Sequence, residues 1–548
     1  MKNFVNSKRP LSQGNLFLSK IEEYIPANSI IFGIQAFLES YSWDSWLREY
    51  EAGKIGRSII HPKYLVGSLL FGLIVNIRST RKLEEAANTR VELIYFLDGR
   101  TFDHTTVAKF RLRFKDALED LNREIIDSIL CKDADALHTL VCDGTRIRAN
   151  NSLFNTRKGA TIERMRADIL AELSKRQREL DVIFEQEQEI ERVRMEYEAL
   201  LQEQQEVSVQ ELQAANAEAM RVLKQKEQEL EQNRVKSEYE KKKMMRRISA
   251  LEKRSKNLEK SLHKAQENDK RRKAKLGKNA MPSRVPIADP DANVLLSKEG
   301  YMAPNYTPVV TVDGATGAII HQEVAANSEE AFIVKESVEL AKELGGEPKE
   351  FLADTAFATG ENLEFLEKEE IQAIMPSITN FAASNPANRE DPSQPVNQEL
   401  WKELPKKGSQ LSKTAFIYDD ALDAYHCPMG RLLTFAYIDN RKTQVRRYVS
   451  KDCSNCLLSS QCLKNKTTKR SIKRDPYDDV RERHGRLMLK EESIEKYKER
   501  SPKVETVFAR IKGLQKIRNF LTRGHERVKL EWLWICTSYN LKLLLLSQ

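Results

Sequence analysis

The chain has 548 residues, with 90 Lys and Arg against 81 Asp and Glu, a net charge of +9 and a pI near 8.9. This length suits two or three domains, and the mild basic excess is compatible with a polyanionic partner without demonstrating one. The N-terminus lacks the apolar core of a secretory signal, and the apolar run at residues 543–546 is too short to span a bilayer. We therefore expect a cytoplasmic protein without a membrane partner, in which clustered cysteines bind metal rather than form disulfides.

Residues 1–135 are predicted to form an all-helical N-terminal domain. Amphipathic helices follow one another from residue 30, with Ser79 and either Asp103 or Thr105 as candidate N-caps. Basic side chains recur beside the apolar faces, which favours a helical DNA-binding domain over a bundle whose charges only solvate it. These candidate DNA-binding residues are Arg78, Arg81, Lys109, Arg111 and Arg113.

Residues 136–160 begin an α/β domain, in which Asp143 closes the apolar strand-like run of LHTLVCDGTRIRAN. Residues 161–276 interrupt this domain and contain neither Gly nor Pro. Their apolar residues fall on two heptad grids that are out of phase, which is typical of a coiled coil with a break near residues 203–216. The grids are Ile162, Ile169, Ile183, Ile190 and Tyr197, with Arg176 interrupting, and Leu223, Leu230, Met244, Leu251 and Leu258, with Ser237 interrupting.

The geometry of this insertion follows from the segments around it. The strand at Asp143 and the strands after residue 300 should share one sheet, so the chain must leave and return. A single straight helix would separate the two halves by about 170 Å at ~1.5 Å per residue. We therefore predict an antiparallel helical hairpin.

Residues 285–380 continue the α/β domain. YTPVVTVDGATGAIIHQEV predicts a β-hairpin, and a helix, the strand KEFLADTAF with Asp354 at its end, another helix and another strand follow. Residues 381–480 are predicted as an insertion with clustered cysteines. Residues 481–548 are predicted to complete the α/β domain with C-terminal helices, one of which begins at Glu505.

Three acidic residues that are far apart in the sequence each lie at the end of a predicted strand or the start of a predicted helix. Asp143 and Asp354 each close an apolar strand, and Glu505 begins a helix rich in Lys and Arg. Any one of them alone would be a cap or loop residue. Brought together, the three carboxylates could hold two Mg²⁺ ions and catalyse phosphodiester chemistry.

The chain resembles the DDE transposases of bacterial insertion sequences, in the branch with a helical N-terminal domain and a Tyr-Arg-Glu-Lys signature. The signature reads YKERSPKVETVFARIK, and further matches are FDHTTVAKFRLRF, DGTRIRAN and LADTAFATGEN. The resemblance covers roughly residues 20–150 and 285–540. It implies a ribonuclease-H-like α/β catalytic domain in which Asp143, Asp354 and Glu505 are the catalytic, metal-binding triad for Mg²⁺ or Mn²⁺. Tyr497, Arg500 and Lys512, together with Arg146 and Arg148 in the segment around Asp143, would contact DNA.

The function implied is a transposase that binds the terminal inverted repeats of its element, cleaves DNA and transfers the strand ends to target DNA. Its partners would be double-stranded DNA and a second copy of the chain or more, in a nucleoid-associated bacterial setting. Two alternatives remain open: a catalytically idle DNA-binding protein derived from a transposase, and a metal-dependent nuclease without strand transfer. From their seven-residue spacing we expect Glu505 and Lys512 to share one helix face.

Four cysteines cluster within the 381–480 insertion. Cys427, Cys453, Cys456 and Cys462 could close a tetrahedral thiolate site, so a structural Zn²⁺ is favoured over free thiols. His426 could replace one ligand. Cys131, Cys142 and Cys536 fall in apolar settings and are expected to be buried.

Overall fold

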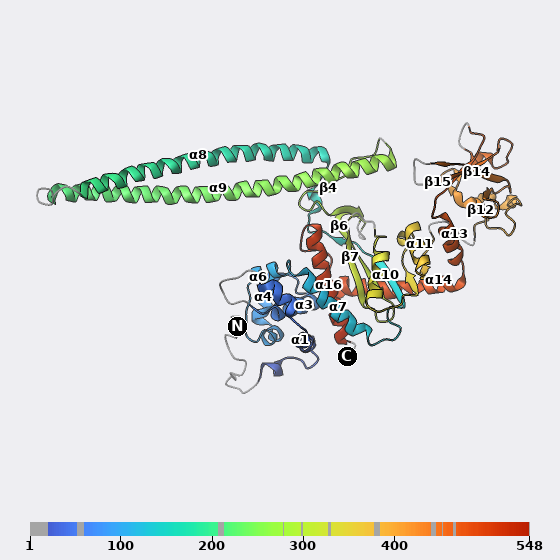
Figure 1. The fold of residues 1–548 in the computed structure, drawn as a ribbon, viewed down its shortest axis with the longest axis horizontal. Helices are drawn as coiled ribbons and strands as arrows, with labels where there is room; N and C mark the ends of the chain where they lie inside the picture. Colours follow the sequence, from blue (N-terminus) through green and yellow to red (C-terminus); the bar gives the residue numbers. More distant parts are fainter. Residues whose placement is uncertain are drawn as a thin grey trace. The chain divides into compact units, whose positions relative to one another are not determined.

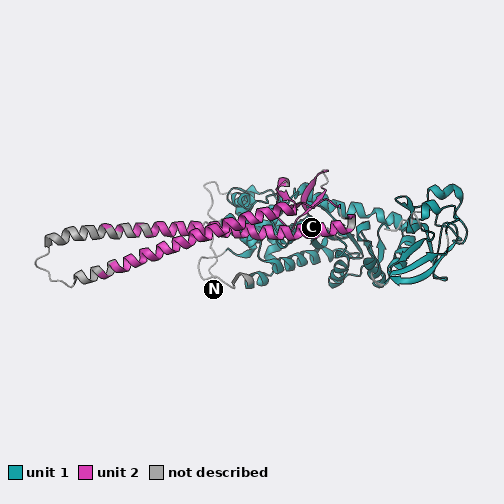
Figure 2. Ribbon diagram, turned by 90° about the horizontal axis from the view of Figure 1, so that it is seen from above, with its two compact units in different colours: residues 1–147, 306–548 teal, residues 148–305 magenta. Residues whose placement is uncertain are grey.

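The computed structural model describes residues 20–51, 60–205, 213–277, 279–296, 300–326, 330–377, 384–439, 445–451, 453–463 and 467–546. The chain divides into two compact units, which Figure 2 colours differently. Unit 1 comprises residues 1–147 and 306–548, and unit 2 comprises residues 148–305. Within the described ranges, no helix combines the length and the apolar character needed to cross a membrane.

The first part of unit 1 is helical, as predicted. Pro62 begins its helix, where a missing N–H is tolerated, and His61 caps that helix. Asp103 caps another by accepting a hydrogen bond from Thr105 N at 2.7 Å, whereas Ser79 occupies an N-cap position without a side-chain bond. The helices are η1 (Ile21–Tyr24), α1 (Ile30–Ser40), α2 (Asp44–Glu51), α3 (Pro62–Ile74), α4 (Thr80–Thr89), α5 (Val91–Phe96), α6 (His104–Phe110), α7 (Lys115–Leu130) and, from the end of the chain, α16 (His525–Leu546).

The C-terminal helix α16 shares one hydrophobic core with these N-terminal helices (Figure 1). It is apolar around most of its circumference, which is typical of a helix buried on several sides. Trp534 Nε1 donates a hydrogen bond to the Arg111 carbonyl at 3.1 Å. The buried Asn540 side chain donates to Asn122 Oδ1 at 3.2 Å and to the Ile319 carbonyl at 2.9 Å. The N-terminal helices are therefore completed by the last helix of the chain.

A mixed sheet in the order β7-β6-β1-β8-β9 forms the centre of unit 1. β1 pairs antiparallel with β6 and parallel with β8, so Val141 lies opposite Val312 on one side and Leu352 on the other. This order agrees with the predicted α/β organisation and is consistent with a ribonuclease-H-like fold. The elements are β1 (Thr139–Gly144), β6 (Met302–Asp313), β7 (Ile319–Ala325), α10 (Ile333–Glu343), β8 (Glu350–Leu352), η3 (Thr355–Phe357), α11 (Gly360–Lys368) and β9 (Gln372–Ile374).

The cysteine-containing part of unit 1 is an antiparallel sheet in the order β12-β13-β14-β15-β16. Its core includes Tyr425 and Tyr448, whose rings meet edge to face at 5.2 Å. The elements are η4 (Gln398–Lys402), β10 (Lys406–Lys407), β11 (Gln410–Leu411), η5 (Lys413–Ala415), β12 (Ile417–Asp419), β13 (Ala424–His426), β14 (Leu432–Asp439), β15 (Val445–Ser450), α12 (Ser459–Cys462) and β16 (Ser471–Arg474). The helices α13 (Asp478–Leu487), α14 (Glu491–Lys498) and α15 (Arg500–Ala509) and the π-helical turn η6 (Arg510–Leu514) follow.

Unit 2 is dominated by two long helices that run antiparallel (Figure 1). The ion pairs between them show the direction: Arg166 bonds Glu259 at 3.2 Å, and Lys241 bonds Glu187 at 2.6 Å. The elements of unit 2 include η2 (Leu153–Asn155), β3 (Thr156–Arg157), α8 (Gly159–Gln205), α9 (Gln213–Leu276), β4 (Val285–Pro286) and β5 (Asn293–Leu296). The short strand β2 (Ile147–Arg148) lies at the junction of the two units in the sequence.

The contact between α8 and α9 uses residues from both heptad grids. Ile162 and Ile169 from the first grid and Leu258 from the second are buried in one cluster, and Met244 and Leu251 pack against it. Apolar side chains at a seven-residue spacing therefore meet along the hairpin. The side chains of Tyr197, Leu223 and Leu230 lie outside the described residues, and so does the link at residues 206–212, which is half of the predicted break.

A buried histidine in the sheet should make the stability of unit 1 depend on pH. His321 Nδ1 lies 2.9 Å from Ser337 Oγ, and burial lowers its pKa from 6.5 to about 4, against the opposing effect of Glu323. Between these two pKa values the unfolded chain binds a proton that the folded chain does not, so stability should fall as pH falls through this window. By about pH 5 the loss should reach up to about 2 kcal/mol.

The measurement is urea unfolding at neutral and at acidic pH, for the wild type and for His321→Asn. The variant should be less stable at neutral pH but should show a flatter pH dependence. An unchanged slope in the variant would contradict the role of His321.

Candidate active site

Asp143 lies near the end of the central strand β1, next to the guanidinium of Arg500. Arg500 Nη2 is 2.8 Å from Asp143 Oδ1, and the two side chains are 11% and 21% exposed. Burial raises the pKa of Asp143, Arg500 opposes this, and the negative charges of Asp354 and Glu505 raise the pKa further. The three predicted carboxylates therefore act on one another electrostatically, although they come from distant parts of the chain.

Sheet topology explains how Asp354 approaches Asp143. Asp354 follows strand β8, which pairs parallel with β1, and the carboxyl ends of parallel neighbours meet at one sheet edge. The Asp354 side chain is exposed and accepts a hydrogen bond from Thr355 N at 2.5 Å, which caps η3. One carboxylate oxygen is thus used to hold the turn, while the residue as a whole is exposed at this edge.

Helix α15 packs against β1 and presents Glu505 on an exposed position. Val504 and Phe508 anchor the helix in the core. The expectation that Glu505 opens this helix is wrong, because the helix begins at Arg500. Pro502 does not prevent the earlier start, since proline is tolerated in the first turn of a helix.

The donor set fits a divalent cation. Asp143, Asp354 and Glu505 offer hard oxygen ligands of the kind that Mg²⁺ prefers. A cation would also relieve the repulsion that raises the pKa of Asp143. Within the described part of the chain, however, the oxygens of these three residues do not all lie within 4.8 Å of one another. Arg500 supplies the positive charge beside Asp143 in this structure.

Two further signature residues border the same edge of the sheet. The Tyr497 phenol is half-buried, and its pKa is raised by burial and by Asp354 and Asp143, against the effect of Arg500. Lys512 Nζ donates hydrogen bonds to Thr145 Oγ1 and, at 3.0 Å, to the Arg146 carbonyl. Both side chains therefore lie close to the segment that carries Asp143.

The predicted alignment of Glu505 and Lys512 on one α-helical face is wrong. α15 ends at Ala509, and Lys512 belongs to the π-helical turn η6, in which Gln515 N bonds the Arg510 carbonyl at 3.0 Å. A π-turn holds more residues than an α-turn, so a seven-residue spacing no longer equals two turns. Such turns occur often at functional sites.

Glu330 is a further carboxylate near this edge that the sequence patterns did not single out. Burial raises its pKa to about 7, Asp143 and Asp354 add to this effect, and Arg146 opposes it. A Cβ built on Gly144 would lie 2.0 Å from Glu330 Oε2, so the carboxylate rests directly against the backbone beside Asp143. The only signal in the sequence was an acid just ahead of the helix that follows the β-hairpin.

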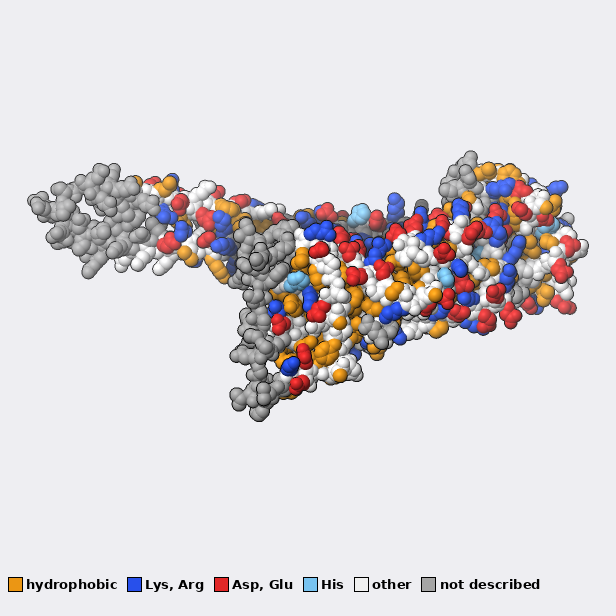
Figure 3. Space-filling view, turned by 60° about the horizontal axis from the view of Figure 1, so that its bottom comes forward, with side chains coloured by type: hydrophobic (Ala, Val, Ile, Leu, Met, Phe, Trp, Pro, Cys, Tyr) orange, Lys and Arg blue, Asp and Glu red, His pale blue; other side chains and the backbone are white. Residues whose placement is uncertain are grey.

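Most of the predicted DNA-binding cations of the helical region and the β1 end are exposed. Arg113 also lies over the Phe114 ring at 5.2 Å, and in unit 2 Arg148 donates to the Tyr301 hydroxyl at 3.3 Å. On the face drawn in Figure 3, Lys and Arg side chains are interspersed with Asp and Glu. The exposed members of the predicted set are Arg81, Lys109, Arg113, Arg146 and Arg148.

Arg78, also predicted to contact DNA, differs from them because its side chain is buried and paired within the protein. Its guanidinium donates to the Asn519 carbonyl and lies 3.4 Å from Glu531 Oε1, with the side chains only 11% and 5% exposed. Glu531 also accepts hydrogen bonds from the backbone of Leu521 and Thr522. Arg78 thus closes a buried polar network between the N-terminal helices and the end of the chain. Arg111 is half-buried and lines a small cavity together with Arg78 and Glu531.

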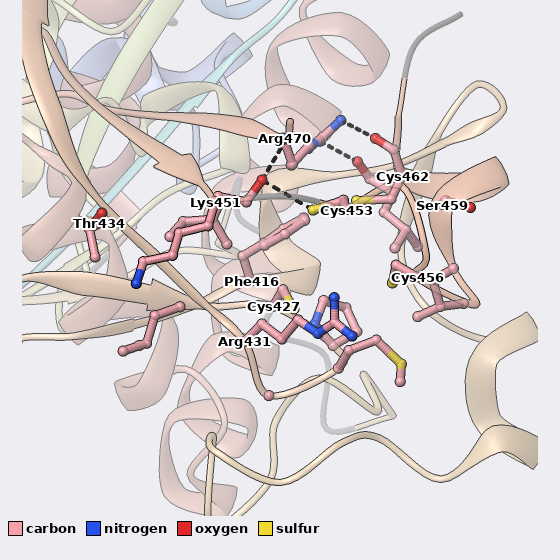
Figure 4. Close-up of a pocket in the computed structure, with 18 residues that line it drawn as sticks. Phe416, Cys427, Arg431, Thr434, Lys451, Cys453, Cys456, Ser459, Cys462 and Arg470 are labelled. Atoms are coloured by element: carbon pink, nitrogen blue, oxygen red, sulfur yellow. Dashed lines mark hydrogen bonds between the residues drawn. The ribbon is translucent and has the colours of Figure 1, made fainter. Parts of the chain in front are cut away.

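The four clustered cysteines line one cavity of about 610 Å³ (Figure 4). Burial raises the pKa of Cys427 and raises that of Cys462 to about 11, and in both residues Cys453 and Cys456 act in the same direction. Cys453 Sγ donates to Ser450 Oγ at 3.1 Å. As far as the structure describes the chain, no three of these sulfur atoms lie within 4.8 Å of one another. The thiolate donor set fits Zn²⁺, which would relieve the mutual repulsion of buried thiolates.

The predictions for His426 and for the three cysteines outside the cluster have different outcomes. His426 is buried at the end of β13, its Nε2 lies 3.2 Å from Asp419 Oδ2, and it does not line the cysteine cavity. Cys142 and Cys536 are buried as expected. Cys131 is exposed, so its predicted burial is wrong, because it lies just beyond the last turn of α7.

One other group of ligand-type side chains occurs among the described residues. Glu84, Asp103 and His104 lie together in the helical region, with His104 Nδ1 2.8 Å from Glu84 Oε2. Asp103 is already used as the cap of α6. The contact between His104 and Glu84 and the capping role of Asp103 explain why these three side chains lie together, so no metal needs to be invoked.

Two family models match the chain. A transposase DDE domain matches residues 426–545, which include Tyr497, Arg500, Glu505 and Lys512. A second model, described as a transposase domain, matches residues 7–113 in the helical region. The comparisons with curated proteins and with solved structures found no match.

Proposed function

Since the chain belongs to the DDE transposases of insertion sequences, whose family implies DNA binding and divalent-metal use, we propose that it moves such an element. It binds the terminal inverted repeats, cleaves a DNA strand at each end and joins the ends to target DNA. Both reactions are in-line displacements at phosphorus, so one site serves both. The observation that carries this proposal is the ion pair of Arg500 with Asp143 at the sheet edge where parallel pairing of β1 and β8 also brings Asp354.

In this proposal each residue at the sheet edge has a distinct task. Asp143, Asp354 and Glu505 hold Mg²⁺ or Mn²⁺, which when bound polarises the phosphodiester and assists the attacking and leaving oxygens. Arg500 orients the Asp143 carboxylate through their ion pair. Lys512, which bonds Thr145 and the Arg146 carbonyl just after Asp143, and Tyr497 of the signature segment contact phosphates of the element end.

The helical region supplies the second part of DNA binding. Arg81, Lys109 and Arg113 are exposed on or next to helices α4 and α6, where they can reach phosphates, and a helix can read base edges in the major groove. Because α16 completes the core of this region, binding must be tested on the full chain rather than on a fragment ending near residue 135. Holding two element ends together further suggests a homodimer or a larger assembly in the DNA complex.

The test is incubation of the full chain with DNA that carries the element's terminal repeats, in Mg²⁺ or Mn²⁺, with nicking and joining scored separately. Nicking at the repeat boundary followed by joining to a second duplex would support transposition. Nicking without joining would favour the metal-dependent nuclease. Repeat binding without either reaction would favour the idle DNA-binding protein.

We also propose that the cysteine cavity holds a structural Zn²⁺. The purified protein should then contain about one zinc per chain, and Cys453→Ser with Cys456→Ser should remove it and lower Tm, because four thiolates form a closed structural site. Elemental analysis and thermal unfolding provide the measurements. Cys131→Ser is the matched control, since Cys131 is exposed and lies outside the cluster. If the wild type contains no zinc and the double variant has the same Tm, the four cysteines are free thiols instead.

A further inference from the structure

One stretch of helix α9 in unit 2 carries far more positive than negative charge. Residues 241–276 hold 15 Lys and Arg against four Asp and Glu, whereas residues 213–240 of the same helix hold five against six. The neighbouring helix α8 is acidic, with seven Lys and Arg against 12 Asp and Glu. The positive excess is therefore confined to one stretch of one helix rather than spread over the hairpin.

Four cations of this stretch share the outward face of α9. Arg246, Lys253 and Lys260 recur every seven residues, which is close to two helical turns, and Lys256 lies between the last two on the same side. The opposite face packs against α8, where Leu258 is buried. All four cations are exposed, and together they form a basic stripe about 21 Å long, at a rise of ~1.5 Å per residue.

The basic stripe lacks the ion pairs that exposed cations make elsewhere on the hairpin. On α8, for example, Arg192 bonds Glu189 at 2.6 Å. In the part of the chain that the structure describes, no acid pairs with any of the four cations of the stripe. Glu259, the acid next to Lys260, instead bonds Arg166 of α8 at 3.2 Å. The positive charge of the stripe is thus not neutralised within the hairpin.

The spacing of these cations costs stability when no anion is bound. Lys253 and Lys256 are three residues apart, and Lys256 and Lys260 are four apart, which are spacings at which like charges destabilise a helix. A polyanion relieves this repulsion. Duplex DNA carries one negative charge per ~1.7 Å of its axis, so the stripe matches the length of about six base pairs.

The outward face suits DNA better than a protein partner. A protein interface usually has apolar and aromatic side chains at its centre, whereas Ser249 and Asn257, which share the face with the stripe, are polar and exposed. We propose that the basic stripe binds the phosphate backbone of duplex DNA whatever its sequence, because Lys and Arg contacts to phosphate do not read bases. This goes beyond the proposed function, which assigns repeat recognition and chemistry to unit 1.

The test measures binding of the full chain to a duplex of random sequence at several salt concentrations. A quadruple variant, Arg246→Gln with Lys253→Gln, Lys256→Gln and Lys260→Gln, should bind about tenfold or more weakly. Its plot of log affinity against log salt should be shallower by about 3 to 4, since each lost phosphate contact removes about 0.9. Each single substitution should remove about 0.9 by itself, so the test does not depend on the folding of the quadruple variant.

The matched control removes four exposed cations from the acidic helix α8. It combines Arg164→Gln, Lys175→Gln, Arg178→Gln and Arg192→Gln, which changes the net charge equally and should leave the salt dependence close to that of the wild type. Equal losses in both quadruple variants would show an effect of net charge alone and overturn the stripe.

Two other results would also overturn the proposal. One is an unchanged salt dependence in the stripe variant. The other is unchanged DNA affinity together with loss of a salt-sensitive dimer in sedimentation, which would show that the stripe faces the acidic helix of a second copy. Repeat cleavage is scored separately: if the stripe fails while cleavage persists, the proposed function stands. If the wild type does not cleave repeat DNA but its random-duplex binding depends on the stripe, only the proposed function falls.

Discussion

Cleavage of element-end DNA should fall by about a thousandfold or more when Asp143 or Asp354 is replaced by Asn, or Glu505 by Gln. Each change removes one metal-binding charge and keeps the shape of the side chain, so repeat binding should persist. Groups that bind metal as a unit lose activity non-additively, and double variants should be scarcely worse than single ones. The measurements are strand cleavage with Mg²⁺ and, separately, mobility-shift binding to the repeats.

Lys512→Ala is the contrasting variant. Lys512 bonds Thr145 and the Arg146 carbonyl rather than a carboxylate, so its loss should weaken end binding and leave metal binding in place. Near-normal cleavage by Glu505→Gln would show that the third ligand has been misplaced. Glu499 would then be the acid to test, because Glu531 is buried and its oxygens are occupied by the loop at Leu521.

The main features of the candidate site could be predicted because they depend on local patterns. An apolar run that ends in an acid marks the end of a buried strand, and parallel pairing then brings Asp143 and Asp354 to one edge. The signature segment likewise marked Arg500, whose ion pair with Asp143 the structure shows. These patterns do not predict Glu330, because its contact with the strand at Gly144 depends on how the segment before α10 packs.

Non-local packing accounts for the other differences between prediction and structure. An arginine beside an apolar helix face looks the same whether it meets DNA or a buried acid far along the chain, as Arg78 does. The last helix seemed to belong to the catalytic part alone, but its apolar surface extends around the helix and also fills the N-terminal core. The π-turn that carries Lys512 has no signal in residue spacing, because spacing arguments assume a regular helix.

The buried pair of Arg78 and Glu531 should therefore be among the most important contacts for stability. Removing one partner leaves the other charge buried and uncompensated, so Arg78→Met or Glu531→Leu should each cost about 3–5 kcal/mol in free energy of unfolding. Glu531→Leu also removes the acceptor for Leu521 N and Thr522 N, and should be the worse of the two. Urea unfolding of the full chain measures both.

Replacing both residues together should recover part of the loss, because no isolated charge then remains, although the loop amides stay unsatisfied. Arg81→Met is the control, since Arg81 lies three residues away and is exposed, and it should leave stability within about 0.5 kcal/mol of the wild type. Repeat binding should be weaker in Arg81→Met and unchanged in Arg78→Met at temperatures where both remain folded. The opposite pattern, with Arg78→Met stable but defective in DNA binding, would place Arg78 on the DNA-binding surface and show that its pairing with Glu531 opens when DNA is bound.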